Sequence, residues 1–236
     1  MAVPGLFVVG TDTDVGKTRV AAAIVRGLFA AGMRVGVYKP VASGCPRIDV
    51  PGTDPWELWH AAGRPRDVTD VCPQAFAAPI APAMSARAEG RSVDESLLRR
   101  GLSEWESASD MIVVEGAGGL FSPIGDTTLV ADLAREFGRP LVVVDAARLG
   151  AVGRTLATVR AARAEGLTVA AVVLSHTSPP RGTADDPASD VSIARDAVAE
   201  LSRRLAPVPV AIFEHGATLP PQIDWRSLAA PPRAAT

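Results

Sequence analysis

The chain has 236 residues, 47 % of them hydrophobic and 5 % aromatic, and a formal net charge of −2. This composition excludes a disordered chain, and a near-neutral charge without a basic cluster gives no support for a nucleic acid partner. The first residues carry no export signal and no apolar run approaches the ~18 residues of a membrane span, so we expect no membrane partner. The isolated Cys45 and Cys72 fit no metal spacing. We expect both to be small buried thiols in a reducing cytoplasm.

Short runs rich in Val and Ile predict strands at 6–10, 34–40, 110–116, 140–146, 168–175 and 208–213. Most are apolar continuously, which is typical of strands covered on both faces of a parallel sheet. Helical patterns lie between them, at 17–31, 54–62, 93–106, 127–137, 152–165 and 189–205. This alternation predicts one doubly wound α/β domain over residues 1–236, with a mostly parallel sheet flanked by helices and right-handed crossovers.

Some segments interrupt this alternation. Residues 40–53 and 63–92 are rich in Pro, Gly and Ala and are long enough to be functional loops. Residues 177–190 are expected to form a loop that projects from the surface, and the Pro-rich tail 216–236 is expected to be weakly structured.

The segment "GLFVVGTDTDVGKTRV", residues 5–20, contains a glycine-rich turn that ends in Gly-Lys-Thr. A strict phosphate loop reads G-x-x-x-x-G-K-[ST], but position 11 is a threonine here and the first glycine comes one place early. The context of strand, turn and helix still favours nucleotide binding, because loop amides and the helix N-terminus attract phosphate. Lys17 would reach the terminal phosphates, and the Thr18 hydroxyl would bind Mg²⁺.

The negative charges of two aspartates in this loop would repel a phosphate unless each faces a cation or a cationic ligand. Asp14 suggests a second ligand that carries an ammonium group, whereas Asp12 is better interpreted as a solvated turn residue.

Charged residues also follow the neighbouring predicted strands. Glu115 ends "MIVVEGAGG" and suits a Mg²⁺ ligand beside phosphate, and Lys39 ends "VYKPVASG", where it could neutralise a transferring phosphoryl group. Asp54 opens a helix and is either an N-cap or a site residue, and the local sequence does not decide between them. Asp145 ends a further strand, and Gly150 precedes a helix whose N-terminus could hold an anion. The scattered histidines receive no catalytic role.

Four features in this order, "GTDTDVGKT", "YKPVASG", the Asp54 helix and "VEGAGGLFSP", closely resemble the dethiobiotin synthetases over residues 5–175. The resemblance implies a P-loop NTPase-like fold and a homodimer with active sites at the subunit interface. It also implies a reaction in which 7,8-diaminononanoate takes up CO₂ as a carbamate. ATP phosphorylates the carbamate in the presence of Mg²⁺, and the second amine closes the ureido ring.

By this resemblance, the residues divide into overlapping groups. Catalysis would use Lys39, Lys17, Thr11 and Ser43. The diamine or carbamate would contact Thr11 and Ser43, and the metal would bind Thr18, Asp54 and Glu115. Gly150 and Arg154 are further candidates for a substrate contact, from the local sequence and not from the resemblance. Nucleotide contacts would come from Asp14, Val15, Gly16, Lys17, Thr18, Arg19, Asp54, Glu115, Gly116, Ala117, Gly118, Ser175 and His176.

The chain departs from the family pattern in three places. Ser175 and His176 replace an Asn-Asp pair whose Asn reads adenine, and no Gly-x-Ile-Pro stretch is recognisable near "VAIFEHG", so the base preference is open. Gly153 and Arg154 replace an Asn-His pair that receives the substrate carboxylate of the partner subunit. Arg154 is either a replacement ligand for that carboxylate or a solvated helix-start residue.

Two other classes share parts of this pattern. A partition-type ATPase switch would carry a lysine four residues before the last glycine of the loop, where this chain has Asp12. An ATP-dependent amide ligase related to corrin amidation would need a glutaminase domain with a reactive cysteine, for which 236 residues leave no room. Partner-dependent ATPase activity would favour the first class, and strict glutamine dependence the second.

Overall fold

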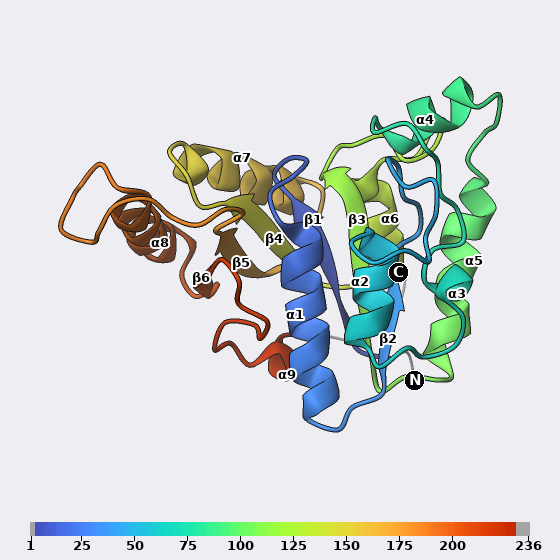
Figure 1. Ribbon diagram of the computed structural model, residues 1–236, viewed down its shortest axis with the longest axis horizontal. Helices are drawn as coiled ribbons and strands as arrows, with labels where there is room; N and C mark the ends of the chain where they lie inside the picture. Colours follow the sequence, from blue (N-terminus) through green and yellow to red (C-terminus); the bar gives the residue numbers. More distant parts are fainter. Residues whose placement is uncertain (1–2, 230–236) are drawn as a thin grey trace.

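The computed structural model describes residues 3–229, and its centre is a parallel β-sheet (Figure 1). Its strands stand in the order β2-β3-β1-β4-β5-β6, and every pairing between neighbours is parallel. Their bounds are β1 Gly5–Gly10, β2 Val35–Tyr38, β3 Met111–Gly119, β4 Leu141–Ala146, β5 Val169–Ser175 and β6 Val210–Phe213. The doubly wound α/β architecture predicted from the sequence is confirmed.

Helices cover both faces of this sheet. In Figure 1, α1 and α2 lie in front of the strands and α6 lies behind β3. Right-handed crossovers place α7 and α8 on the same far face as α6. The helix bounds are α1 Lys17–Ala30, α2 Asp54–Ala61, α3 Val68–Val71, α4 Pro82–Ala88, α5 Glu95–Glu106, α6 Val130–Phe137, α7 Ala151–Ala164, α8 Asp190–Leu205 and α9 Trp225–Leu228. Within residues 3–229, no helix is both long and apolar enough to cross a bilayer.

The continuous apolar runs became strands because they are buried on both sides. Every residue of β1, β2, β4 and β5 is buried. β3 extends three residues beyond its predicted end at 116, because pairing with β1 resumes after a register shift and joins Gly10 to Gly119. The predicted loop 63–92 contains the short helices α3 and α4.

The tail is more ordered than expected as far as the structure describes it. α9 lies beside α1, and Trp225 is only 5 % exposed. Arg26 of α1 donates to the Thr218 carbonyl, at 3.2 Å between Nη1 and O. Residues 230–236 of the predicted tail lie outside the described residues.

Gly101 of α5 packs against the ring of Tyr38, whose hydroxyl donates to the carbonyls of Leu97 and Leu98. A Cβ at Gly101 would overlap the Tyr38 hydroxyl. We therefore expect Gly101→Ala to lower the free energy of unfolding by about 1–3 kcal/mol, although alanine is the better helix former. Gly153→Ala is the matched control, because no atom lies within 4 Å of a Cβ there. It should leave stability unchanged or raise it by up to ~1 kcal/mol in urea titrations.

Candidate active site

Many of the predicted site residues, including Lys17, Thr18, Lys39, Asp54 and Glu115, lie together at the carboxyl ends of β1, β2 and β3. β1 lies between β3 and β4, so the loop after β1 meets side chains from both neighbouring strands. This is the edge at which doubly wound folds bind ligands. A cavity of ≈ 650 Å³ opens here between the phosphate loop, the segment after β2 and α2. That volume suits a small-molecule site.

The loop between β1 and α1 has the backbone of a phosphate cradle. Gly16 has φ 91°, in the left-handed region, and caps α1 without a side-chain hydrogen bond to the first turn. The free amides of that turn therefore remain available to an anion. Asp14 also has positive φ, 56°, and lines the cavity. The Asp12 side chain accepts from the Thr13 amide at 2.7 Å, which agrees with a turn role for Asp12.

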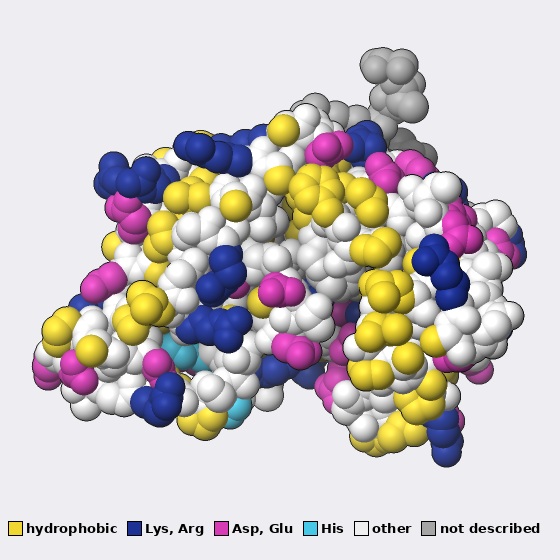
Figure 2. All heavy atoms as spheres, turned by 90° about the horizontal axis from the view of Figure 1, so that it is seen from above, with side chains coloured by type: hydrophobic (Ala, Val, Ile, Leu, Met, Phe, Trp, Pro, Cys, Tyr) yellow, Lys and Arg dark blue, Asp and Glu magenta, His cyan; other side chains and the backbone are white. Residues whose placement is uncertain are grey.

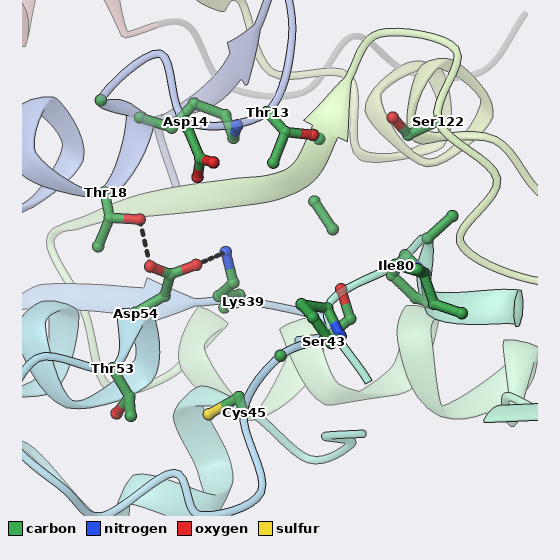
Figure 3. Close-up of a pocket in the computed structure, with 18 of the residues that line it drawn as sticks. Thr13, Asp14, Thr18, Lys39, Ser43, Cys45, Thr53, Asp54, Ile80 and Ser122 are labelled. Atoms are coloured by element: carbon green, nitrogen blue, oxygen red, sulfur yellow. Dashed lines mark hydrogen bonds and ion pairs between the residues drawn. The ribbon is translucent and has the colours of Figure 1, made fainter. Parts of the chain in front are cut away.

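Lys39 forms the centre of a charged cluster below this loop. Its Nζ lies 2.7 Å from Asp54 Oδ2 (Figure 3). The same Nζ lies 2.8 Å from Glu115 Oε1. Glu115 is fully buried and Lys39 is 2 % exposed, whereas the Asp54 side chain is half-exposed. Asp54 thus serves the site, and no side-chain cap from it is seen at α2, whose N-cap is Thr53. Of the two interpretations that the sequence left open, these contacts favour the site role over the N-cap role.

The opposite charges of Lys39 and the two carboxylates shift the pKa values of all three groups towards their charged forms and so oppose the effect of burial. Burial alone would lower the pKa of Lys39, but Asp54 and Glu115 outweigh it and hold that pKa above its ordinary value. Burial opposes ionisation of Asp54 too, yet the Lys39 charge prevails and lowers the Asp54 pKa. Burial raises the pKa of Glu115, and Lys39 opposes this only in part. Lys39 therefore remains an ammonium group at neutral pH.

Three oxygens meet where the sequence predicts a metal. Thr18 Oγ1 lies 2.7 Å from both Asp54 Oδ1 and Glu115 Oε1. One hydroxyl hydrogen cannot serve both carboxylates, and Glu115 Oε2 is buried without any hydrogen-bond partner. Hard oxygen ligands with an unmet charge fit Mg²⁺, which keeps several waters and needs few protein ligands. Because Mg²⁺ takes six ligands, water and phosphate would complete the shell around these three side chains. Within residues 3–229, no group of three or more His, Cys, Asp or Glu side chains that could hold a metal ion is found.

The two lysines of the chain, Lys17 and Lys39, both lie in this site. Burial lowers the pKa of Lys17, so a larger share of that amine is neutral at pH 8, whereas the Lys39 pKa is raised. Acylation at pH 8 should therefore modify Lys17 and spare Lys39, and MgADP should protect Lys17. Peptide mapping by mass spectrometry measures both sites, and the chain's α-amine serves as the internal reference. Equal labelling of the two lysines would contradict this charge assignment.

Most predicted nucleotide residues border the cavity or support it. The lining includes Asp14, Gly16, Lys17, Thr18, Arg19, Lys39, Ser43, Asp54, Ala117 and Gly118. Val15 and Gly116 are buried beneath it. Ser175 lies behind the loop, because a Cβ on Gly16 would come 2.5 Å from Ser175 Oγ. The His176 carbonyl accepts from Arg19 Nη1 at 2.9 Å.

Thr11 does not line the cavity. Its hydroxyl donates to Asp145 Oδ1 at 2.6 Å, on the far side of β1 from Lys39. The threonine of this loop that borders the cavity is Thr13, opposite Ser122 in Figure 3. The geometry therefore favours Thr13 over Thr11 for a contact with substrate, and it adds Ser122 and the apolar segment 79–82 to the wall. The run "PIAP" at 79–82 was the available signal for that wall.

Gly150 and Arg154 lie at the start of α7, away from the cavity. Gly150 has φ 88° and caps the helix. Arg154 Nε is 3.2 Å from both carboxylate oxygens of Asp145, so this arginine is not the solvated residue that one interpretation expected.

Cys45 and Cys72 are both free and buried, as predicted. They pack together with Ala42 in a small apolar cluster, and Cys45 also borders the cavity. Burial raises the pKa of both thiols, that of Cys72 to about 12. Neither thiol is therefore a ready nucleophile.

A family model described as an AAA domain matches residues 4–219. The ATP-dependent dethiobiotin synthetase of Rhodopirellula baltica is 46 % identical over 72 % of this chain and 72 % of its own length. The enzymes of that name from Anaeromyxobacter dehalogenans strains 2CP-C and 2CP-1 are each 42 % identical, over 85 % and 89 % of this chain and 86 % and 89 % of their own. The chain belongs to the dethiobiotin synthetase family. The family prediction drawn from four sequence motifs is thus confirmed.

Solved structures agree on the fold alone. ParA of pNOB8 bound to nonspecific DNA has a TM-score of 0.55 at 13 % identity and covers 94 % of this chain and 88 % of its own. The cell division protein FtsY of Thermotoga maritima has a TM-score of 0.52 at 14 % identity, and the match covers 92 % of this chain and 63 % of FtsY.

Proposed function

We propose that this member of the dethiobiotin synthetase family is an ATP-dependent cyclo-ligase, which closes a ureido ring on 7,8-diaminononanoate with CO₂ and releases ADP and phosphate. The observation that carries the proposal is the position of Lys39. Its ammonium group, held by two carboxylates, borders the same cavity as the phosphate loop and Ser43. A carbamate there would lie against the outer end of a triphosphate.

The chemistry needs this juxtaposition. A carbamate carbon is a poor electrophile, and phosphorylation of its oxygen supplies a leaving group. Lys17 and Lys39 offset the negative charge that gathers as carbamate and phosphate approach. Once the second amine is held beside the activated carbon, ring closure is intramolecular, which is worth about 7–11 kcal/mol.

The cavity wall fits a diamine with an aliphatic chain. Ser43 and Thr13 offer hydroxyl groups, and Asp14 offers a carboxylate to an amine. The opposite wall at 79–82 carries Pro79, Ile80 and Pro82, against which methylene groups can pack. Thr18, Asp54 and Glu115 would hold Mg²⁺, which when bound supplies a Lewis acid at the phosphates.

A second cavity of ≈ 440 Å³ continues from the first and shares Thr18, Arg19, Gly52 and Asp54 with it. It lies between α1 and α2 and is bounded by residues 216–218. This cavity has room for a nucleoside. On its border, Arg19 donates to the His176 and Glu214 carbonyls. The base preference stays open, because Ser175 and His176 stand where the family pattern has an Asn-Asp pair.

We also propose a homodimer. Several large apolar side chains are exposed around the carboxyl edge of the sheet, namely Ile80, Met84, Phe121 and Leu149. Figure 2 shows hydrophobic side chains gathered in a band on the right half of this face, the side on which Figure 1 places α4. Exposed apolar surface of this kind marks interfaces. The free thiols and the ligase reaction agree with a location in the cytoplasm.

The test is phosphate release measured with MgATP, the diamine and bicarbonate, each omitted in turn, with dethiobiotin detected by mass spectrometry. Release that needs all three and forms dethiobiotin supports the proposal. Release that ignores the diamine favours a partition-type switch, and release that needs glutamine favours an amide ligase. A panel of nucleoside triphosphates in the same assay measures the base preference.

A further inference from the structure

Asp145 is a fully buried carboxylate at the end of β4 to which the proposed reaction gives no role. Its Oδ1 accepts from Thr11 Oγ1 at 2.6 Å and from the Ala146 amide at 2.8 Å. Arg154 Nε lies 3.2 Å from both of its oxygens, and Thr155 Oγ1 lies 3.3 Å from Oδ2. A buried carboxylate is tolerated only when it is paired and hydrogen-bonded, and Asp145 meets both conditions.

The donors come from two different parts of the fold. Thr11 is the first residue after β1, and its amide also donates to the Val144 carbonyl at 2.9 Å. Thr11 is therefore fixed to β4 by its main chain and by its side chain. The next residue, Asp12, uses its carbonyl to accept from Lys17 Nζ at 3.0 Å. A continuous set of contacts thus leads from Asp145 to the lysine of the phosphate loop.

On the other side, Asp145 holds the first turn of α7 through Arg154. The two Nη atoms of Arg154 donate to the carbonyls of Leu149 and Ala146, at 3.2 and 3.4 Å. The guanidinium group thereby fixes the turn 146–150. Its charge is offset by Asp145, so a carboxylate from elsewhere would have to compete with Asp145 for it.

We propose that Asp145 is a positioning residue of the nucleotide site, which holds Thr11, and through it the loop that carries Lys17, against the first turn of α7. The proposal rests on the proposed function only in taking residues 10–18 as the nucleotide site. It assigns Thr11 a support role in place of the substrate contact that the family resemblance implied.

The decisive experiment compares two hydroxyl deletions on the same carboxylate. Thr11→Val removes the contact to the loop, and Thr155→Val removes the contact to the buried side of α7, where Thr155 is 0 % exposed. Loss of a hydrogen bond to a charged group predicts that Thr11→Val weakens MgADP binding about 10-fold by calorimetric titration. Thr155→Val should lower the melting temperature and leave MgADP affinity unchanged. Thr11→Ser, which restores the hydroxyl, should restore the affinity.

Asp145→Asn provides a second measurement. In the Thr11→Val background it should weaken MgADP binding little further, because the contact is already lost. Equal effects of Thr11→Val and Thr155→Val on MgADP affinity would reduce Asp145 to a purely structural residue. A rise in the KM of the diamine with unchanged MgADP affinity would make Thr11 a direct substrate contact and overturn the proposal. Because the titration needs no turnover, its result stands apart from any failure of the unaltered protein to form dethiobiotin.

Discussion

Lys39→Met is expected to lower kcat for dethiobiotin formation by about 10²–10³, the usual effect of removing one group that stabilises transition-state charge. Lys39 is the ammonium group nearest to both Asp54 and Glu115. Without it, the carboxylates repel the carbamate and phosphate that must meet here. Single-turnover assays with saturating MgATP and diamine measure the loss. MgADP affinity should change far less than kcat, because the loop amides and Lys17 remain.

The matched control is Arg139→Met. Arg139 is also a buried cation paired with an acid, at 2.7 Å from Glu106, but it precedes β4 at the opposite end of the strands. Both substitutions should destabilise the fold, by up to about 3–5 kcal/mol for Lys39→Met, which leaves the fully buried Glu115 without its partner, and by less for Arg139→Met, because the Glu106 side chain is 32 % exposed. Only Lys39→Met should change kcat of the folded protein. A kcat that falls equally in both variants would show that stability, not charge, explains the loss.

Gly16→Ala is expected to weaken MgADP binding by about 100-fold or more, because a side chain there combines backbone strain with a collision. Gly16 has φ 91°, and a Cβ would lie 2.5 Å from Ser175 Oγ and 3.1 Å from Ser175 Cβ. Ser175 belongs to β5 and is fully buried, so the loop must move instead. The amides that face the phosphates would move with it.

Gly32→Ala is the control that separates the backbone strain at Gly16 from the collision with Ser175. Gly32 has φ 83°, nearly the same backbone strain, but nothing lies within 4 Å of a Cβ there. It follows the end of α1, far from the loop. It should cost about 1 kcal/mol of stability and leave calorimetric MgADP binding intact. If Gly32→Ala weakened binding as much as Gly16→Ala, the loop would not be the nucleotide site.

The sequence predicted the fold and the nearness of Lys39 to Glu115, and the reason is physical. Short continuous apolar runs rich in Val and Ile favour strands covered on both faces, and charges directly after parallel strands lie at one edge of the sheet. Lys39 and Glu115 were found in this way, and their contact at 2.8 Å follows from the pairing of β2 with β3.

Contacts that depend on loop backbone could not be predicted. Thr11 and Thr13 are two residues apart in one turn, and only the actual φ and ψ angles decide that Thr13 borders the cavity while Thr11 turns to Asp145. The pairing of Arg154 with Asp145 was equally hidden, because the turn 146–150 folds back between them. A turn that reverses the chain direction leaves no hydrophobic periodicity in the sequence from which it could be predicted.

The packing of the segment after β6 against α1 has a practical consequence for protein engineering. Pro220 would touch a Cβ on Gly27, Thr218 accepts from Arg26, and Trp225 is embedded in the main core. A chain that ended at Phe213 would lack residues 216–218, which form one wall of the second cavity. It would also expose the apolar surface that Trp225 covers, and burial of such a side chain stabilises the fold by about 1.5–3 kcal/mol. Shortened variants made for crystallisation should therefore retain the chain through Leu228.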